Sequence, residues 1–152
     1  MTALGLCLVL AASAAAPVFV PGERFTLAWT HSIEKVRWEE DYTVQPGPSP
    51  GAAPVLRAPS ARVRGSAAGM EPPADARLHG GWYHYTPRQA RPEALRLTRS
   101  EFTADYELCT AGRCLPLAHW LPSDGGITLL TACHAPIAPR QQPGPTSGNL
   151  NE

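Results

Sequence analysis

The chain has 152 residues, and its 13 basic and 13 acidic side chains give a formal net charge of zero. This length suits one domain with one core that needs neither a metal ion nor a disulfide to fold. The neutral charge excludes a long-range attraction to nucleic acid or to an anionic membrane surface. The 17 prolines and 13 glycines argue against long helices, because an interior proline costs a helix about 3 kcal/mol.

The apolar segment at residues 1–16 has two interpretations. It ends in small residues, as a signal peptide does, but no basic residue precedes Arg24, so the usual positive n-region is missing. The alternative, which we favour, is a first β-hairpin in which Leu4–Leu10 pairs with Pro17–Val20. A transmembrane helix is the least favoured, because a span needs about 20 apolar residues.

The hairpin interpretation makes a prediction about burial. Alternate residues of the first strand, Leu6, Leu8 and Leu10, should point into the core, because successive strand residues face opposite sides. The turn at residues 11–16, which consists entirely of Ala and Ser, should be exposed.

Two alternating runs follow. Residues 25–30 place Phe25, Leu27 and Trp29 on one face, which is the pattern of a half-buried strand. Residues 36–44 also alternate, with Trp38, Glu40, Tyr42 and Val44 on one face and Arg37, Glu39, Asp41 and Thr43 on the other. A helix is the alternative for this second run, since Glu and Lys favour helices and no Pro or Gly interrupts it. The Pro- and Gly-rich residues 45–54 predict a loop.

Shorter strand signals occupy the rest of the chain at residues 56–64, 82–85, 95–98 and 127–132. Short alternating runs that are separated by turn signals favour a sandwich or a barrel. We therefore predict an all-β fold, an antiparallel sandwich or small barrel with short strands, in a single domain at residues 1–133. The polar residues 134–152 have too little apolar content to fold and are predicted to be a disordered tail.

The sharpest local signal is the segment from Asp105 to Leu117. If Cys109 lies opposite Cys114 across a four-residue turn, Leu108 pairs with Leu115. This leucine pair lies on the face of the hairpin opposite the cysteines, so register and hydrophobic pattern agree. Gly112 supplies the positive φ that such a turn needs. We predict a hairpin closed by a Cys109–Cys114 disulfide.

The alternatives for these cysteines are free thiols and a redox or metal site. The C-x₄-C spacing is not the usual C-x-x-C of a redox pair. A tetrahedral zinc site needs two further ligands, and the adjacent Cys133 and His134 would point to opposite faces of a strand. The sequence leaves open the redox state of Cys7 and Cys133. A structural disulfide at 109–114 implies an oxidising compartment.

Candidate binding residues gather in one polar segment and one aromatic segment: His31, Ser32, Glu34, Glu39, Glu40 and Trp82. On a strand His31 and Ser32 face opposite sides, so they cannot form a nucleophile–base pair. No Gly-x-Ser-x-Gly elbow is present. The alternative is a purely structural role, in which the carboxylates of this segment are solvated and the histidine packs in the core. For Trp82 the structural alternative is core packing. We predict no catalytic residue, no metal site and no cofactor.

The motifs Thr-His-Ser-Ile-Glu at residues 30–34, Trp38-Glu-Glu, Gly69-Met70, Trp82-Tyr83 and Leu108-Cys-x₄-Cys-Leu resemble domain-of-unknown-function family 1850 over roughly residues 4–133. The resemblance implies a small bacterial protein, often encoded beside TRAP-type transporters whose binding protein is of the TAXI kind. Members commonly begin with a charged, hydrophobic export segment, and residues 1–16 do not show the charged part expected of it. No activity is implied.

The resemblance favours a non-enzymatic accessory or interaction module linked to a TRAP-type solute transporter, whose subunits would be its partners. The first alternative is a small-ligand-binding β-domain with a site near His31, Glu34 and Glu40. The second is an unrecognised hydrolase or metal enzyme. With the disulfide, the resemblance predicts an extracytoplasmic location, periplasmic or at the cell surface, and a cytoplasmic one is the alternative. Membrane association would come only through a partner.

Overall fold

The structure is a computed structural model that describes residues 3–30, 35–65 and 74–136. In these ranges the regular elements are β-strands and one turn of 3₁₀ helix, η1 (Leu117–His119). The strands in chain order are β1 (Leu4–Leu10), β2 (Val18–Pro21), β3 (Arg24–Thr30), β4 (Arg37–Gln45), β5 (Val55–Arg64), β6 (Arg77–His79), β7 (Trp82–Tyr85), β8 (Leu95–Thr98), β9 (Glu107–Thr110), β10 (Arg113–Pro116) and β11 (Ile127–His134).

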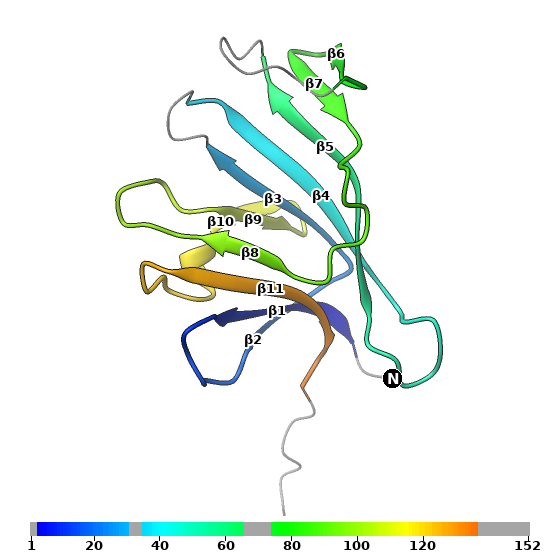
Figure 1. Ribbon diagram of the computed structural model, residues 1–152, viewed down its shortest axis with the longest axis vertical. Helices are drawn as coiled ribbons and strands as arrows, with labels where there is room; N and C mark the ends of the chain where they lie inside the picture. The colour runs from blue at the N-terminus through cyan, green and yellow to red at the C-terminus, as the bar shows by residue number, and fades with distance from the viewer. Residues whose placement is uncertain (1–2, 31–34, 66–73, 137–152) are drawn as a thin grey trace, which may run out of the picture.

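The strands form two antiparallel sheets (Figure 1). The smaller sheet has the order β2-β1-β11-β8, and the larger has the order β10-β9-β3-β4-β5-β7-β6. Both sheets keep two open edges, so the molecule is a sandwich and not a closed barrel. The predicted all-β antiparallel fold is confirmed, and residues 37–45 form a strand rather than the alternative helix.

The core lies between the sheets and is built from the apolar half of each alternating strand. Leu8 and Leu130 of the smaller sheet are almost fully buried, as are Leu27, Leu56 and Leu108 of the larger one. Burying a leucine side chain contributes about 1.5–3 kcal/mol relative to leaving it exposed. The two sheets therefore hold each other through one common cluster of side chains.

The N-terminal segment is a strand of the smaller sheet. β1 pairs with β2, with Leu8 opposite Val18, and pairs along its whole length with β11. Leu6 and Leu8 are buried and residues 11–16 are exposed, as the hairpin interpretation predicts. Leu10 is only partly buried, because it is the last residue of β1 and adjoins the exposed turn.

A disulfide that the sequence left open joins the first and last strands. Cys7 of β1 is bonded to Cys133 of β11, with Cα atoms 5.9 Å apart and a sequence separation of 126 residues. In the antiparallel register Cys7 lies opposite Thr131 and Cys133 lies opposite Gly5. The two cysteines are therefore diagonal neighbours on adjacent strands, within reach of a disulfide. This bond excludes free thiols at both positions and removes Cys133 from the set of potential metal ligands.

The hairpin at the second disulfide has the predicted register but a tighter turn. Cys109 pairs with Cys114 and Leu108 with Leu115, and Thr110 also pairs with Arg113. The loop is therefore two residues long, with φ of 53° at Ala111 and 78° at Gly112. Positive φ at both central positions is typical of a type I′ turn, whose twist matches that of the flanking strands.

Residues 46–54 of the predicted loop connect β4 to β5, and Gln45 is instead the last residue of β4. At the other end of the chain β11 continues to His134, one residue past the predicted domain boundary. The predicted tail from residue 137 onward lies outside the described residues.

Candidate functional site

Strand β4 divides its side chains between two surfaces of the larger sheet. Tyr42 and Val44 are buried on the face toward the smaller sheet, which we call the inner face. By alternation Trp38 and Glu40 share that inner face. Arg37, Glu39 and Asp41 therefore lie on the opposite, outer face. The two adjacent glutamates thus belong to two different sites.

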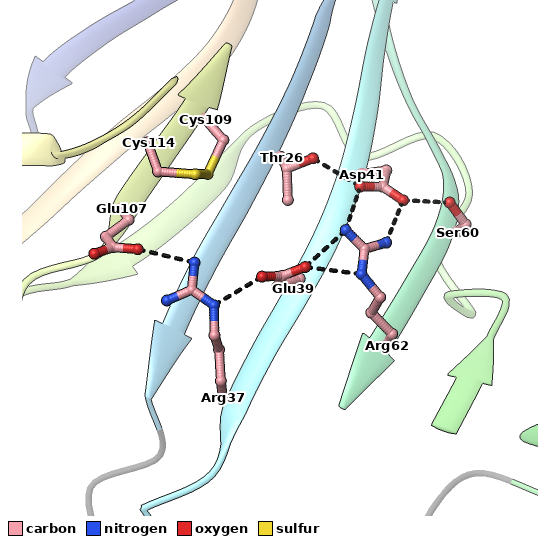
Figure 2. A network of polar contacts seen from close by, with 9 residues as sticks. All are labelled: Thr26, Arg37, Glu39, Asp41, Ser60, Arg62, Glu107, Cys109 and Cys114. Carbon is pink, nitrogen blue, oxygen red and sulfur yellow. Dashed lines mark hydrogen bonds and ion pairs between the residues drawn. A yellow bond between two sulfur atoms is a disulfide. The ribbon is translucent and has the colours of Figure 1, made fainter. Parts of the chain in front are cut away.

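The outer face carries a charge network made of Arg37, Glu39, Asp41, Arg62 and Glu107 (Figure 2). Strand pairing explains it, because Arg62 of β5 lies opposite Glu39 of β4. Arg62 Nη2 lies 2.7 Å from Glu39 Oε1, and its Nη1 lies 2.8 Å from Asp41 Oδ2.

Arg37 extends the network toward β9. Its Nε donates to Glu39 Oε2 at 2.7 Å, and its Nη2 lies 2.9 Å from Glu107 Oε1. Figure 2 shows the five side chains as one chain of contacts across β9, β3, β4 and β5. Such a network fixes the strands against each other through charge-assisted hydrogen bonds.

Asp41 is the most heavily bonded carboxylate of the network. Besides Arg62 it accepts hydrogen bonds from Thr26 Oγ1 at 2.7 Å and from Ser60 Oγ at 2.6 Å. Burial alone would raise the pKa of Asp41, but the bonds from Arg62, Ser60 and Thr26 outweigh burial and hold this pKa below its ordinary value. Asp41 is therefore ionised throughout the physiological range.

The Cys109–Cys114 disulfide lies beside this network on the same face (Figure 2). Its Cα atoms are 3.9 Å apart, and the predicted bond is confirmed. Next to the hairpin is a hollow of 510 Å³, lined by side chains and backbone of β3, β4 and the β9–β10 turn. Two exposed arginines, Arg24 and Arg113, line this hollow.

Trp82 also belongs to the outer face, since it pairs with Arg64 and lies one strand beyond the network. The guanidinium carbons of Arg64 and Arg62 lie 5.4 Å and 6.0 Å from the centre of its ring. These are cation–π distances. Trp82 is partly buried beneath arginine side chains on an outer surface, and not in the core between the sheets.

The inner face near Glu40 is aromatic. Trp29 stacks on Trp38 with ring centres 6.2 Å apart, and Tyr85 meets Trp38 edge-on at 6.2 Å. The Tyr42 hydroxyl donates a hydrogen bond to Glu40 Oε1. Burial, together with the Glu40 carboxylate, raises the pKa of the Tyr85 hydroxyl to about 12.

The six candidate residues do not form one site. Glu39 and Trp82 share the outer face, while Glu40 lies on the inner face. His31, Ser32 and Glu34 lie outside the described residues, so their roles stay predictions. Sequence analysis did not single out Arg62 or Tyr85 as candidates. Arg62 nevertheless contacts Glu39, and Tyr85 lies near Glu40. Alternation places β4 side chains correctly, but only the strand pairing shows which residues of β5 and β7 lie opposite them.

The described part of the chain gives two further findings about chemistry and location. No group of three or more His, Cys, Asp or Glu side chains in it could hold a metal ion. None of its helices is long and apolar enough to cross a membrane. All four cysteines are in disulfides, which indicates an oxidising compartment.

Comparison with known proteins gives a family. Residues 25–117 match the family described as Domain of unknown function (DUF1850), while no curated protein and no solved structure matches the chain. The matched segment runs from β3 to the start of η1, so it contains the charge network, Trp82, Glu40 and the disulfide hairpin. Because the match spans more than half of the 152 residues, this chain belongs to the DUF1850 family.

Proposed function

We propose that this protein is a non-enzymatic accessory module of a bacterial TRAP-type solute transporter, acting in the periplasm or at the cell surface. The outer face of its larger sheet docks onto an acidic surface of a transporter subunit. The observation that carries the docking proposal is the surplus of arginine on that face. The choice of a transporter subunit as the partner rests on what the resemblance to this family implies, and the two disulfides support the compartment.

The surplus follows from the strand register. The charge network uses Arg37 and Arg62 against three carboxylates, so it is internally satisfied. Four more arginines share the outer face by register, and none of them forms an ion pair with another described residue: Arg24, Arg57, Arg64 and Arg77. A face with unpaired cations on a chain of zero net charge favours an acidic partner.

The shape of the face supports a protein partner. The hollow of 510 Å³ beside the disulfide hairpin has Arg24 and Arg113 among its lining residues, and the Asp41 carboxylate that also lines it is already paired with Arg62. Arginine suits an acidic partner because its planar fork binds a carboxylate through two parallel hydrogen bonds. The side chains of the network are already held by ion pairs, so docking costs little further ordering of them.

The test is co-purification of a tagged protein from its native host, with transporter subunits identified by mass spectrometry. The variant is the double change Arg24→Glu with Arg64→Glu, and the control is Arg96→Glu, an exposed arginine on β8 of the other sheet. We expect the subunits to come with the parent and the control and to be lost with the double variant. Their absence from the parent, or their retention by a folded double variant, would refute the proposal.

A further inference from the structure

Glu40 stands apart from its neighbours because no cation among the described residues compensates its charge. Glu39 and Asp41, on either side of it in the sequence, both contact Arg62. Within the described ranges no Arg, Lys or His side chain lies at ion-pair distance from Glu40. Its hydrogen-bond partner is the Tyr42 hydroxyl, and a carboxylate can accept several more hydrogen bonds than this one.

The surroundings of Glu40 make an uncompensated charge costly. In the sheet register Leu27 lies opposite it on one side and Ala61 on the other, and both are buried. Tyr42, Tyr85 and Tyr106 are near enough for its charge to add to the effect of burial and raise the pKa of all three hydroxyls. A partly buried carboxylate among aromatic rings favours a cation that arrives from outside.

A cavity gives such a cation access to Glu40. Its volume is 240 Å³, below the roughly 300–1,000 Å³ of pockets for drug-sized ligands, so it suits a small solute. Glu40, Tyr42 and Tyr85 line it from the sheet, and the segment that connects β7 to β8 lines it from the other side. In that segment Arg88 is exposed and also lines the cavity.

The aromatic wall continues behind Tyr85. Trp38 meets this tyrosine edge-on, and its buried Nε1–H has no hydrogen-bond partner in the part of the chain that the structure describes. Trp38 does not line the cavity itself, so it supports the aromatic wall through its contact with Tyr85.

We propose that this cavity binds a small zwitterionic solute, with its ammonium group held by Glu40, Tyr42 and Tyr85 and its carboxylate facing Arg88. A bare metal cation fits less well, because hard divalent cations require six or more oxygen ligands and the cavity offers one carboxylate with a few phenols. A simple organic cation would meet the like charge of Arg88. The cavity lies on the inner face, so this proposal is independent of docking through the outer face.

The experiment is isothermal titration calorimetry of the purified, oxidised protein with four probes. Glycine betaine and L-alanine carry both charges, choline carries only the ammonium group, and acetate carries only the carboxylate. We expect saturable binding of at least one zwitterion, weaker binding of choline and none of acetate. The proposal would be overturned if neither zwitterion gave a saturable heat of binding at millimolar concentration. It would also be overturned if acetate bound as tightly as the zwitterions.

Two variants assign the binding to these residues. Glu40→Gln keeps an acceptor for the Tyr42 hydroxyl but removes the charge, and it should weaken zwitterion binding about tenfold or more. Arg88→Gln should abolish the preference for a zwitterion over choline. Glu93→Gln, an exposed change in the same connection, is the control and should bind as the parent does. A folded Glu40→Gln protein, checked by thermal melting, that binds like the parent would overturn the assignment.

Discussion

The carboxylate of Asp105 accepts two parallel hydrogen bonds, each 3.0 Å long, from the buried guanidinium of Arg99. Arg99 follows β8 of the smaller sheet and Asp105 precedes β9 of the larger one. Arg99 Nη1 also donates to Thr128 Oγ1 at 3.1 Å, and Asp105 Oδ2 accepts from the backbone N–H of Ala118 at 2.8 Å. The pair therefore fixes the crossing of the chain from one sheet to the other.

Breaking this pair should destabilise the domain strongly. Asp105→Asn leaves a buried guanidinium without its counter-charge, and losses of this kind cost about 3–5 kcal/mol. Denaturant unfolding should show a lower midpoint, whereas Arg96→Met, a change at an exposed residue of β8, should change it little. If the unfolding midpoint of the Asp105→Asn protein equalled that of the parent, the pair would not be stabilising the connection between the two sheets.

The two disulfides should contribute unequally. In the loop-closure account, a disulfide stabilises the fold by lowering the entropy of the unfolded chain. The bond that spans 126 residues contributes about 5 kcal/mol in this way, and the bond that spans five residues contributes about 2 kcal/mol. Replacing Cys7 and Cys133 by Ser should therefore lower the melting temperature more than the same change at Cys109 and Cys114. Differential scanning calorimetry checks the order, and the reverse order would contradict it.

The N-terminal strand should be retained in the mature protein. Leu6 and Leu8 are buried in the common core and Cys7 is bonded to Cys133, so removing them would open the smaller sheet. N-terminal sequencing of protein from the native host should find a chain that still contains Cys7. A mature chain that begins at Ala15 would show instead that residues 1–14 are a cleaved signal.

Asp41 should make stability depend on pH in a defined direction. Its folded pKa is lowered below the ordinary 3.8, so the stability it supplies is fully present above that value and is lost as pH falls through the folded pKa. Asp41→Asn should cost about 1–3 kcal/mol near neutral pH, and this difference from the parent should shrink below pH 3.8. Glu101→Gln, an exposed change, should give no such trend in acid-unfolding curves.

The tight turn at Ala111 should be improvable. Ala111 has a φ of 53°, a left-handed conformation that costs an ordinary residue about 1–2 kcal/mol. Asn tolerates this conformation and is preferred at the first central position of a type I′ turn. Ala111→Asn should raise the melting temperature, while Gly112→Ala should lower it. A lower melting temperature for Ala111→Asn would contradict the turn assignment.

The sequence predicted best what depends on neighbours along the chain. The alternation of residues 36–44 assigned Glu39 and Glu40 to opposite faces, and the register of Leu108 with Leu115 located one disulfide. It could not predict what depends on which strands meet. The Cys7–Cys133 bond requires β1 beside β11, and the contact of Arg62 with Glu39 requires β5 beside β4.

The bond between Cys7 and Cys133 has a mechanical consequence. The two ends of the domain lie side by side, since Leu4 pairs with His134 and the Ala135 N–H donates to the Ala3 carbonyl at 2.7 Å. A tension applied between the ends passes through the sulfur–sulfur bond instead of through the strands enclosed by it. The enclosed chain cannot be stretched until that bond is reduced, so the domain transmits force between its termini as a short, inextensible link.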